Sequence, residues 1–304
     1  MQAKLDEIIE RNRRYTKDGA VATYIPGLRK ANRDDLGICI VDKNKRIFTS
    51  GVCDKKFTIQ SISKVVLLSM ALMEHGFDYV HTKVGFEPSD NPFNSIVTIG
   101  NNDVKKPSNP MINSGAIAIT SLIKGDTYEE KEANMMAYFK KFTANNDLKI
   151  NYNVYMSERS TGDRNRAMAY LLKSHGFLDG NVDEILDLYF KQCSIEVDVK
   201  DLAMIGLNLA DQEFINDRGC VISKDVARIV RTVMFLCGMY DGSGEFALKT
   251  GLPSKSGVGG GIMTCVSDAV GIGVFGPSLD ERGNSVAGMK VLEDLSREFD
   301  LSAI

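Results

Sequence analysis

The chain has 304 residues, of which 43% are hydrophobic and 25% are charged, and its formal net charge is −3. These fractions exclude an intrinsically disordered chain and supply enough apolar side chains for one large core or two smaller ones. The mildly acidic charge gives no electrostatic reason to expect a nucleic acid or an anionic membrane as partner.

The chain opens on a charged segment with helical periodicity. Leu5, Ile8 and Ile9 lie at helical spacing, which predicts an amphipathic surface helix and not a signal peptide. The longest apolar run, residues 65–73, contains Ser69 and is too short to span a bilayer. We therefore expect a cytoplasmic protein without a membrane partner.

A β-hairpin is predicted next, because residues 36–41 and 46–49 have strand character and flank the turn residues 42–45. Residues 57–60 form a short extended lead into a long apolar helix over 62–74. The pair His75-Gly76 closes this helix, since histidine suits the last turn and glycine the position after it.

The helical period dominates from about residue 80 to residue 240. Helices are expected over residues 116–123, 166–174, 182–189, 199–210 and 224–236, with loops rich in Asn, Pro and Ser at 87–95 and 101–113. Strand character returns at 261–266 and 270–275, which predict a second hairpin, and residues 284–299 predict a closing helix.

Strands at both chain ends around a helical block predict the α+β class. We expect a single unit over residues 1–304, in which the N- and C-terminal hairpins form one antiparallel sheet with flanking helices and an inserted helical subdomain. The sheet part is expected over about 1–60 and 241–304, and the helical part over about 61–240.

The six cysteines and three histidines carry no metal signal. The cysteines form no Cys-x-x-Cys pair, and the histidines lack the spacing of metal ligands. The cysteines are interpreted as free thiols in the core and the histidines as residues at helix ends. A Ser-His-Asp triad stays open as an alternative, and no metal is expected.

The main chemical signal is the segment Gln60-Ser61-Ile62-Ser63-Lys64. Ser61 and Lys64 are three residues apart at a helix start, so both side chains lie on one face. A serine hydroxyl needs a base, and a lysine serves as one only where burial lowers its pKa from about 10.4. The apolar residues 65–68 predict that burial. The alternative is a structural serine cap.

A second signal lies near the C-terminus, at Lys255-Ser256-Gly257. Lys-Ser/Thr-Gly at a strand start, combined with S-x-x-K on an early helix, is the pattern of serine acyl-transfer enzymes related to penicillin-binding proteins. The following glycines, 259–261, would let a backbone pass close to a substrate. A glycine-rich strand edge is the alternative interpretation.

Six segments together resemble successive signatures of the serine-dependent glutaminase family. They are residues 19–26, 60–64, 109–116, 157–165, 237–241 and 255–261. They stand in the family's order over about residues 19–297, without a departure at a functional position. The chain resembles the compact bacterial form of the family.

The resemblance implies hydrolysis of L-glutamine to L-glutamate and ammonia on a β-lactamase/transpeptidase-like fold, with no metal or organic cofactor. It makes Ser61 the nucleophile and Lys64 its base, with Tyr240 as a proton relay. The backbone N–H groups of Ser61 and Val258 would bind the oxyanion. The resemblance also implies a homo-oligomer, either a dimer or a tetramer.

The same resemblance implies a set of residues in contact with the substrate: Tyr24, Gln60, Ser61, Asn113, Glu158, Asn165, Tyr189, Tyr240 and Val258. A selective site must pair both charges of free glutamine, because a buried unpaired charge is costly. Glu158 suits the α-ammonium, and Asn113, Asn165 and the Tyr24 hydroxyl suit the α-carboxylate. Taken singly, these residues also fit helix-end, turn and core-aromatic roles.

The expected chemistry runs through a glutamyl-Ser61 acyl-enzyme, and ammonia leaves after protonation through Lys64 or Tyr240. Two alternatives stay open at this point. One is a penicillin-recognising acyl-transferase or β-lactamase on the same scaffold, and the other is an inactive glutamine-binding sensor.

Overall fold

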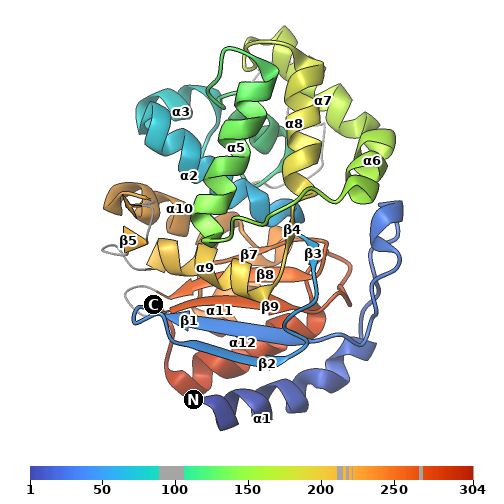
Figure 1. Ribbon diagram of the computed structural model, residues 1–304, viewed down its shortest axis with the longest axis vertical. Helices are drawn as coiled ribbons and strands as arrows, with labels where there is room; N and C mark the ends of the chain where they lie inside the picture. The colour runs from blue at the N-terminus through green and yellow to red at the C-terminus, as the bar shows by residue number, and fades with distance from the viewer. Residues whose placement is uncertain (89–105, 211–214, 217–218, 221, 267–269, 304) are drawn as a thin grey trace.

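A five-stranded antiparallel sheet forms the lower part of the molecule in Figure 1. Its order is β2 (Ile47–Gly51), β1 (Gly37–Asp42), β9 (Val270–Phe275), β8 (Gly261–Val266) and β7 (Ser254–Ser256). The pairing of β1 with β9, in which Ile38 opposes Val274, joins the N-terminal hairpin to the C-terminal one. This confirms the predicted α+β arrangement with one sheet built from both chain ends.

The computed structural model describes residues 1–88, 106–210, 215–216, 219–220, 222–266 and 270–303. Most of the loops expected at 87–95 and 101–113 lie outside these residues. In the described part of the chain, no helix combines the length and the apolarity that a bilayer crossing requires.

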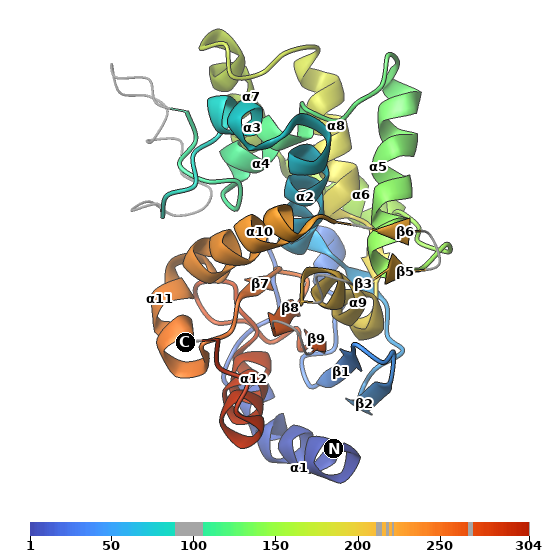
Figure 2. The ribbon, with the colours of Figure 1, turned by 90° about the vertical axis from the view of Figure 1, so that its left-hand side faces the viewer.

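Helices cover both faces of the sheet, so the central strands β1, β9 and β8 are buried on both sides, whereas the edge strand β2 is partly exposed. On one face, α1 (Gln2–Asn12) and α12 (Val286–Phe299) pack with Ile38 and Ile40. On the other face, α9 (Val199–Ala210) packs with Cys39 and Val41. Figures 1 and 2 show these layers, with α9 between the sheet and most of the helical part.

Glycines bring α9 unusually close to the sheet. A Cβ added to Gly271 on β9 would lie 2.0 Å from Ala203 O, and one added to Gly206 on α9 would lie 2.3 Å from Thr264 O. Real Cβ atoms do not approach a backbone oxygen this closely. The contact between α9 and the sheet therefore depends on glycine at these positions.

The apolar helix α2 (Ser63–His75) lies at the centre of the helical part, and every residue from Ser63 to Leu72 is buried. Gly76 follows it with φ 77°, as its position after the last turn predicts. The surrounding helices are α3 (Phe77–Lys83), α4 (Asn113–Thr120), α5 (Tyr128–Thr143), α6 (Tyr152–Thr161), α7 (Asp163–Ser174), α8 (Val182–Cys193), α10 (Lys224–Cys237) and α11 (Ser243–Thr250).

Short elements complete the fold. Strand β3 (Phe57–Thr58) pairs with β4 (Glu196–Val197), and β5 (Ile215–Asn216) pairs with β6 (Gly219–Cys220). The 3₁₀ turns are η1 (Arg13–Lys17), η2 (Pro26–Leu28), η3 (Gln60–Ile62) and η4 (Tyr240–Gly242).

The structure matches the predicted strands of the second hairpin and helix α9 at both ends, but it adds helices that apolar periodicity did not indicate. Helix α5 begins with a capping box, in which Thr127 and Glu130 each accept from the other's backbone N–H. The Thr-x-x-Glu spacing was a usable sequence signal. Helix α4 starts at Asn113, three residues before its predicted start, and so places that side chain on a rigid element.

Candidate active site

A cavity of about 370 Å³ lies between the sheet and the helical part. The cavity brings together all the predicted substrate-contacting residues except Tyr240, which adjoins it. The lining residues of this set are Tyr24, Gln60, Ser61, Asn113, Glu158, Asn165, Tyr189 and Val258. These residues come from segments far apart in the chain. The volume is in the usual range for small-molecule sites.

The backbone before Ser61 adopts a costly conformation. Gln60 has φ 50°, in the left-handed region that non-glycine residues rarely occupy, and its side chain donates to Thr58 Oγ1 at 3.2 Å. Ser61 follows in η3, immediately ahead of α2, where N–H groups lack intrahelical acceptors. Strain of this kind gathers at functional sites, because surrounding structure must hold it in place.

The glycine-rich segment after β7 supports that backbone directly. A Cβ on Gly257 would lie 2.8 Å from Ile59 O, and one on Gly259 would lie 2.3 Å from Thr58 O. The glycines therefore allow close approach to the protein's own residues 58–60. This segment also holds Val258 at the cavity, and within the described residues no backbone carbonyl accepts the Val258 N–H.

Lys64 is only 1% exposed, as the apolar residues around it predict. Its amine donates to Met111 O at 3.0 Å and to Asn113 Oδ1 at 2.7 Å, and Ser61 Oγ is not among its acceptors. Burial lowers the pKa of Lys64 to about 8, although Cys193 and Glu158 oppose that change. A neutral amine has two N–H groups and one lone pair, so these two hydrogen bonds leave the lone pair available.

Tyr240 completes the group around Ser61. It has φ 54° within η4, and its hydroxyl donates to Ser256 O at 3.2 Å. Burial raises the pKa of Tyr240, while its side-chain hydrogen bond with Ser61 opposes that rise. The phenol therefore stays protonated and lies next to the serine hydroxyl.

Lys255 is a second fully buried lysine, and its position shows what the Lys-Ser-Gly segment does in this fold. Its amine donates to Gly238 O at 3.0 Å and to Ser256 O at 2.8 Å, and lies 4.4 Å from the centroid of the Tyr240 ring. Burial, together with the charge of Lys64, lowers the pKa of Lys255. Lys255 thus ties the end of α10 to β7 on both sides of Tyr240.

Glu158 of α6 is the acidic group of the cavity and is 8% exposed. Burial raises its pKa to about 7, while a hydrogen bond with Gln60 and the charge of Lys64 lower it. On the neighbouring wall, Asn113 Nδ2 donates to Asn165 Oδ1 at 3.1 Å. The cavity thus combines one carboxylate with a pair of linked amides.

Two tyrosines mark the extent of the cavity. Tyr189 of α8 is buried in its wall, whereas Tyr24 is 59% exposed and so lies where the cavity meets solvent. Sequence reasoning did not identify Cys193, which also lines the cavity and contacts Tyr189 by a side-chain hydrogen bond. Burial raises the pKa of Cys193 to about 12, so the thiol stays neutral.

The sequence also did not predict the role of the Met111 carbonyl, because no side-chain pattern indicates which backbone oxygen accepts from a buried lysine.

Within the residues that the structure describes, no cluster of three or more histidine, cysteine or acidic side chains could hold a metal ion. The arrangement has the parts of an acyl-transfer site: a hydroxyl, a buried amine, a phenol and backbone N–H groups.

Comparisons with known proteins show which family the chain resembles. The family model described as glutaminase matches residues 19–303. The chain is 58% identical to a glutaminase of Clostridioides difficile (strain 630), over 98% of this chain and 97% of the relative. It is 54% identical to glutaminase 2 of Clostridium perfringens (strain 13 / Type A), over 99% of both chains.

Solved structures show the same similarity. One is the covalent complex between a Bacillus subtilis glutaminase and 5-oxo-L-norleucine, formed by reaction with 6-diazo-5-oxo-L-norleucine. It is 38% identical to this chain and superposes with a TM-score of 0.90, over all of this chain and 99% of the other. A Bacillus glutaminase crystallised in 4.3 M NaCl gives a TM-score of 0.91 at 37% identity, over all of this chain and 99% of that one.

Proposed function

Because this chain belongs to the glutaminase family, we propose that Ser61 is the residue that attacks glutamine and that Lys64 is the base that activates it. The enzyme is a hydrolase that converts glutamine to glutamate and ammonia, and its fold is β-lactamase-like. Neither a β-lactamase nor an inactive sensor is favoured by these comparisons. The contacts within the cavity support the roles of the individual residues.

The observation that carries the proposal is the environment of the Lys64 amine. The amine is buried, and its two hydrogen bonds to Met111 O and Asn113 Oδ1 account for both N–H groups of a neutral lysine. A pKa near 8 keeps a useful fraction neutral at cellular pH. The remaining lone pair is the acceptor for the Ser61 proton.

We propose that the α-ammonium of glutamine pairs with Glu158, the carboxylate among the residues that line the cavity. The α-carboxylate is bound by Asn113, Asn165 and the hydroxyl of Tyr24. Asn113 gives one of its two N–H groups to Asn165, so the second is the one that we assign to the substrate. Gln60 and Tyr189 complete the walls.

In the first half-reaction, Ser61 Oγ attacks the side-chain amide carbon while Lys64 takes its proton. The N–H groups of Ser61 and Val258 bind the oxyanion, and such a donor typically lowers the barrier by about 3–4 kcal/mol. Ammonia leaves with a proton delivered through Lys64 or Tyr240. Water then attacks the glutamyl ester by the reverse proton path and releases glutamate.

The direct test is Ser61→Ala, which should abolish ammonia release and leave glutamine binding measurable by calorimetry. Ser174→Ala is the matched control, because the Ser174 hydroxyl is exposed and donates within its own helix, to Leu171 O at 2.8 Å. Turnover of Ser61→Ala at the wild-type rate would remove Ser61 from the mechanism.

We further propose that the enzyme is cytoplasmic and acts as a homodimer or homotetramer. The support for a reducing compartment is that Cys39, Cys53, Cys193, Cys237 and Cys265 are all free thiols. The resemblance to the family supports the oligomer. We also retain the interpretation of residues 1–304 as one catalytic unit, with the sheet part and the helical part divided near residues 60 and 240. Light scattering after size exclusion would give the oligomeric state.

A further inference from the structure

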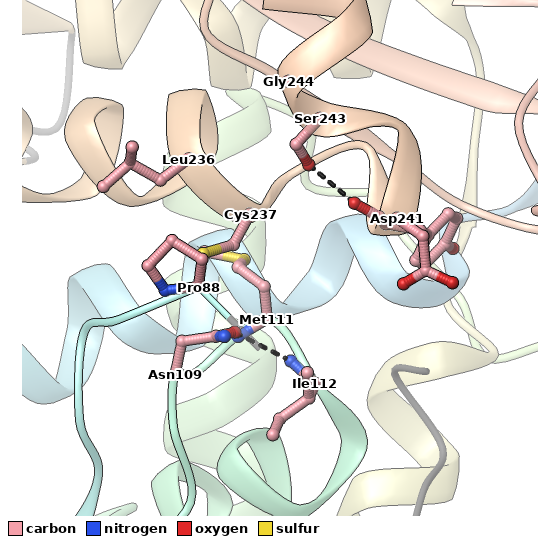
Figure 3. Close-up of a pocket in the computed structure, with 10 residues that line it drawn as sticks. Pro88, Asn109, Met111, Ile112, Leu236, Cys237, Asp241, Ser243 and Gly244 are labelled. Carbon is pink, nitrogen blue, oxygen red and sulfur yellow. Dashed lines mark hydrogen bonds between the residues drawn. The ribbon is translucent and has the colours of Figure 1, made fainter. Parts of the chain in front are cut away.

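A second cavity, of about 190 Å³, adjoins the catalytic group and has no role in the mechanism above (Figure 3). One wall comes from the end of α10, η4 and the start of α11, and the other from the segment that precedes α4. The residues that line it are Pro88, Asn109, Met111, Ile112, Leu236, Cys237, Tyr240, Asp241, Ser243 and Gly244.

Three residues that line this cavity connect it with the catalytic group or with a residue of the substrate cavity. Tyr240 lines the second cavity, and its side chain is hydrogen-bonded to Ser61, which lines the first. Met111 also lines the second cavity, and its carbonyl accepts from Lys64 at 3.0 Å. Ile112 lines it as well and precedes Asn113, which lines the first cavity. The groups that move protons at Ser61 therefore lie at the boundary between the two cavities.

The second cavity has the charge and size for a small amine. Asp241 is the only charged side chain among the described residues that line it. The Cys237 thiol stays neutral, because burial raises its pKa to about 11. A carboxylate beside small polar groups attracts ammonium and admits ammonia, water or methylamine, while it repels the carboxylates of glutamate and glutamine.

We propose that the second cavity binds the departing ammonia and the incoming nucleophile, and that this route is separate from the glutamine site. The inference rests on the proposed function. During the acyl-enzyme stage the glutamyl group stays in the substrate cavity, attached to Ser61. The departing nitrogen is protonated beside Tyr240 and Lys64, and so leaves at the boundary with the second cavity.

The chemistry balances without any further reactant. The amide C–N bond breaks as the Ser61 O–C bond forms, and the serine proton passes to the nitrogen, which leaves as ammonia. When methylamine replaces water, its nitrogen bonds to the acyl carbon, the Ser61 ester C–O bond breaks and one amine proton returns to Ser61. By microscopic reversibility, an amine enters along the path by which ammonia leaves.

Gly244 lines the cavity and tolerates a larger side chain. A Cβ at this position meets no atom within 4 Å, and the residue is not among the glycines with positive φ. We would make Gly244→Phe, and Leu236→Trp on the neighbouring helix, where the leucine is 43% exposed. Leu248→Phe is the matched control, because Leu248 lies on the same helix as Gly244 and is 87% exposed.

The assay supplies saturating glutamine with methylamine and measures the ratio of γ-glutamyl methylamide to glutamate. Each blocking variant should lower this ratio at least about fivefold, because the introduced side chain occupies the space that methylamine needs. The KM for glutamine should stay unchanged, and Leu248→Phe should behave as wild type. An unchanged ratio in both blocking variants would overturn the proposal.

Labelling with 6-diazo-5-oxo-L-norleucine separates this test from that of the proposed function. The wild type and each variant are labelled first, and only variants with full labelling at Ser61 enter the comparison. Should Gly244→Phe fail to fold, Gly244→Leu and Leu236→Trp carry the test. Absence of the Ser61 adduct in wild type would contradict the proposed nucleophile, whereas full labelling with an unchanged methylamide ratio would contradict only the second cavity.

Discussion

The substitution Glu158→Gln should weaken catalysis and strengthen the fold at the same time. Glu158 is buried, and its pKa is raised from 4.5 to about 7. Its folded pKa exceeds its unfolded pKa, so its contribution to stability is fully present below about pH 4.5 and is lost as the pH rises through about 7. Above pH 8 the buried carboxylate therefore destabilises the fold.

The raised pKa of Glu158 sets the size of this effect on the free energy of unfolding. A rise from 4.5 to about 7 corresponds to about 3 kcal/mol above pH 8. Glutamine has the shape of glutamate without the charge, so the variant should recover part of this energy. Loss of the attraction between Glu158 and Lys64 reduces the gain, and we expect about 1–3 kcal/mol at pH 8.5. At pH 5 the difference should fall below about 1 kcal/mol, because the carboxyl group of the folded wild type is then largely protonated and only the unfolded chain still ionises.

Catalysis should change in the opposite direction. The α-ammonium of glutamine loses a charge-assisted hydrogen bond, which typically contributes about 1.5–3 kcal/mol. The KM for glutamine should therefore rise about 10- to 100-fold at pH 8.5. Urea unfolding at pH 8.5 and pH 5, with steady-state kinetics at pH 8.5, measures both effects. Glu281→Gln, at an exposed position, is the control and should change neither.

A merely structural Glu158 would give a different pattern. The variant would then lose stability at pH 8.5 and would keep its KM for glutamine. An unchanged KM would refute the assignment of Glu158 to the substrate ammonium, and a loss of stability at pH 8.5 would refute the destabilising effect of the buried carboxylate.

The two buried lysines and the close approach of α9 to the sheet give three further predictions. The kcat/KM should rise with pH through about 7 to 8, as Glu158 and then Lys64 lose their protons. Lys64→Arg should be inactive at every pH, because the guanidinium group stays charged, and activity in that variant would exclude a neutral base. Lys255→Met removes the donor to Gly238 O and Ser256 O, so the Tyr240 side chain should shift. The kcat should then fall about 100-fold at unchanged KM, and an unchanged kcat would contradict a positioning role for Lys255. Gly271→Ala places a Cβ 2.0 Å from Ala203 O and should lower the free energy of unfolding in urea by about 1–3 kcal/mol. An unchanged midpoint of urea unfolding would contradict the need for glycine at this position.

Local patterns in the sequence predicted the elements that frame the site. Runs of strand-forming residues predicted both hairpins, and the apolar residues after Lys64 correctly indicated that its amine is buried. Both signals are local, since they depend on neighbours within one or two turns of chain. Helix α5 was missed because its face is only partly apolar, although its capping box was present.

Contacts between distant segments could not be derived in this way. The pairing of Lys64 with Met111 O depends on a backbone oxygen, and residue type carries no information about such oxygens. Likewise, the left-handed backbone of Gln60 and Tyr240 results from tertiary packing, because neither residue favours that conformation by itself. Glu158 was assigned to the site only through the resemblance to the family.

Ser61 acting as the nucleophile beside a neutral Lys64 is the central claim about this enzyme. The decisive measurement is mass spectrometry of peptides after reaction with 6-diazo-5-oxo-L-norleucine at pH 8.5, for the wild type and for Lys64→Met. A single 5-oxo-norleucine adduct on Ser61 in the wild type, formed far more slowly in Lys64→Met, is the predicted result. An adduct on any other residue, or labelling of Lys64→Met at the wild-type rate, would contradict it.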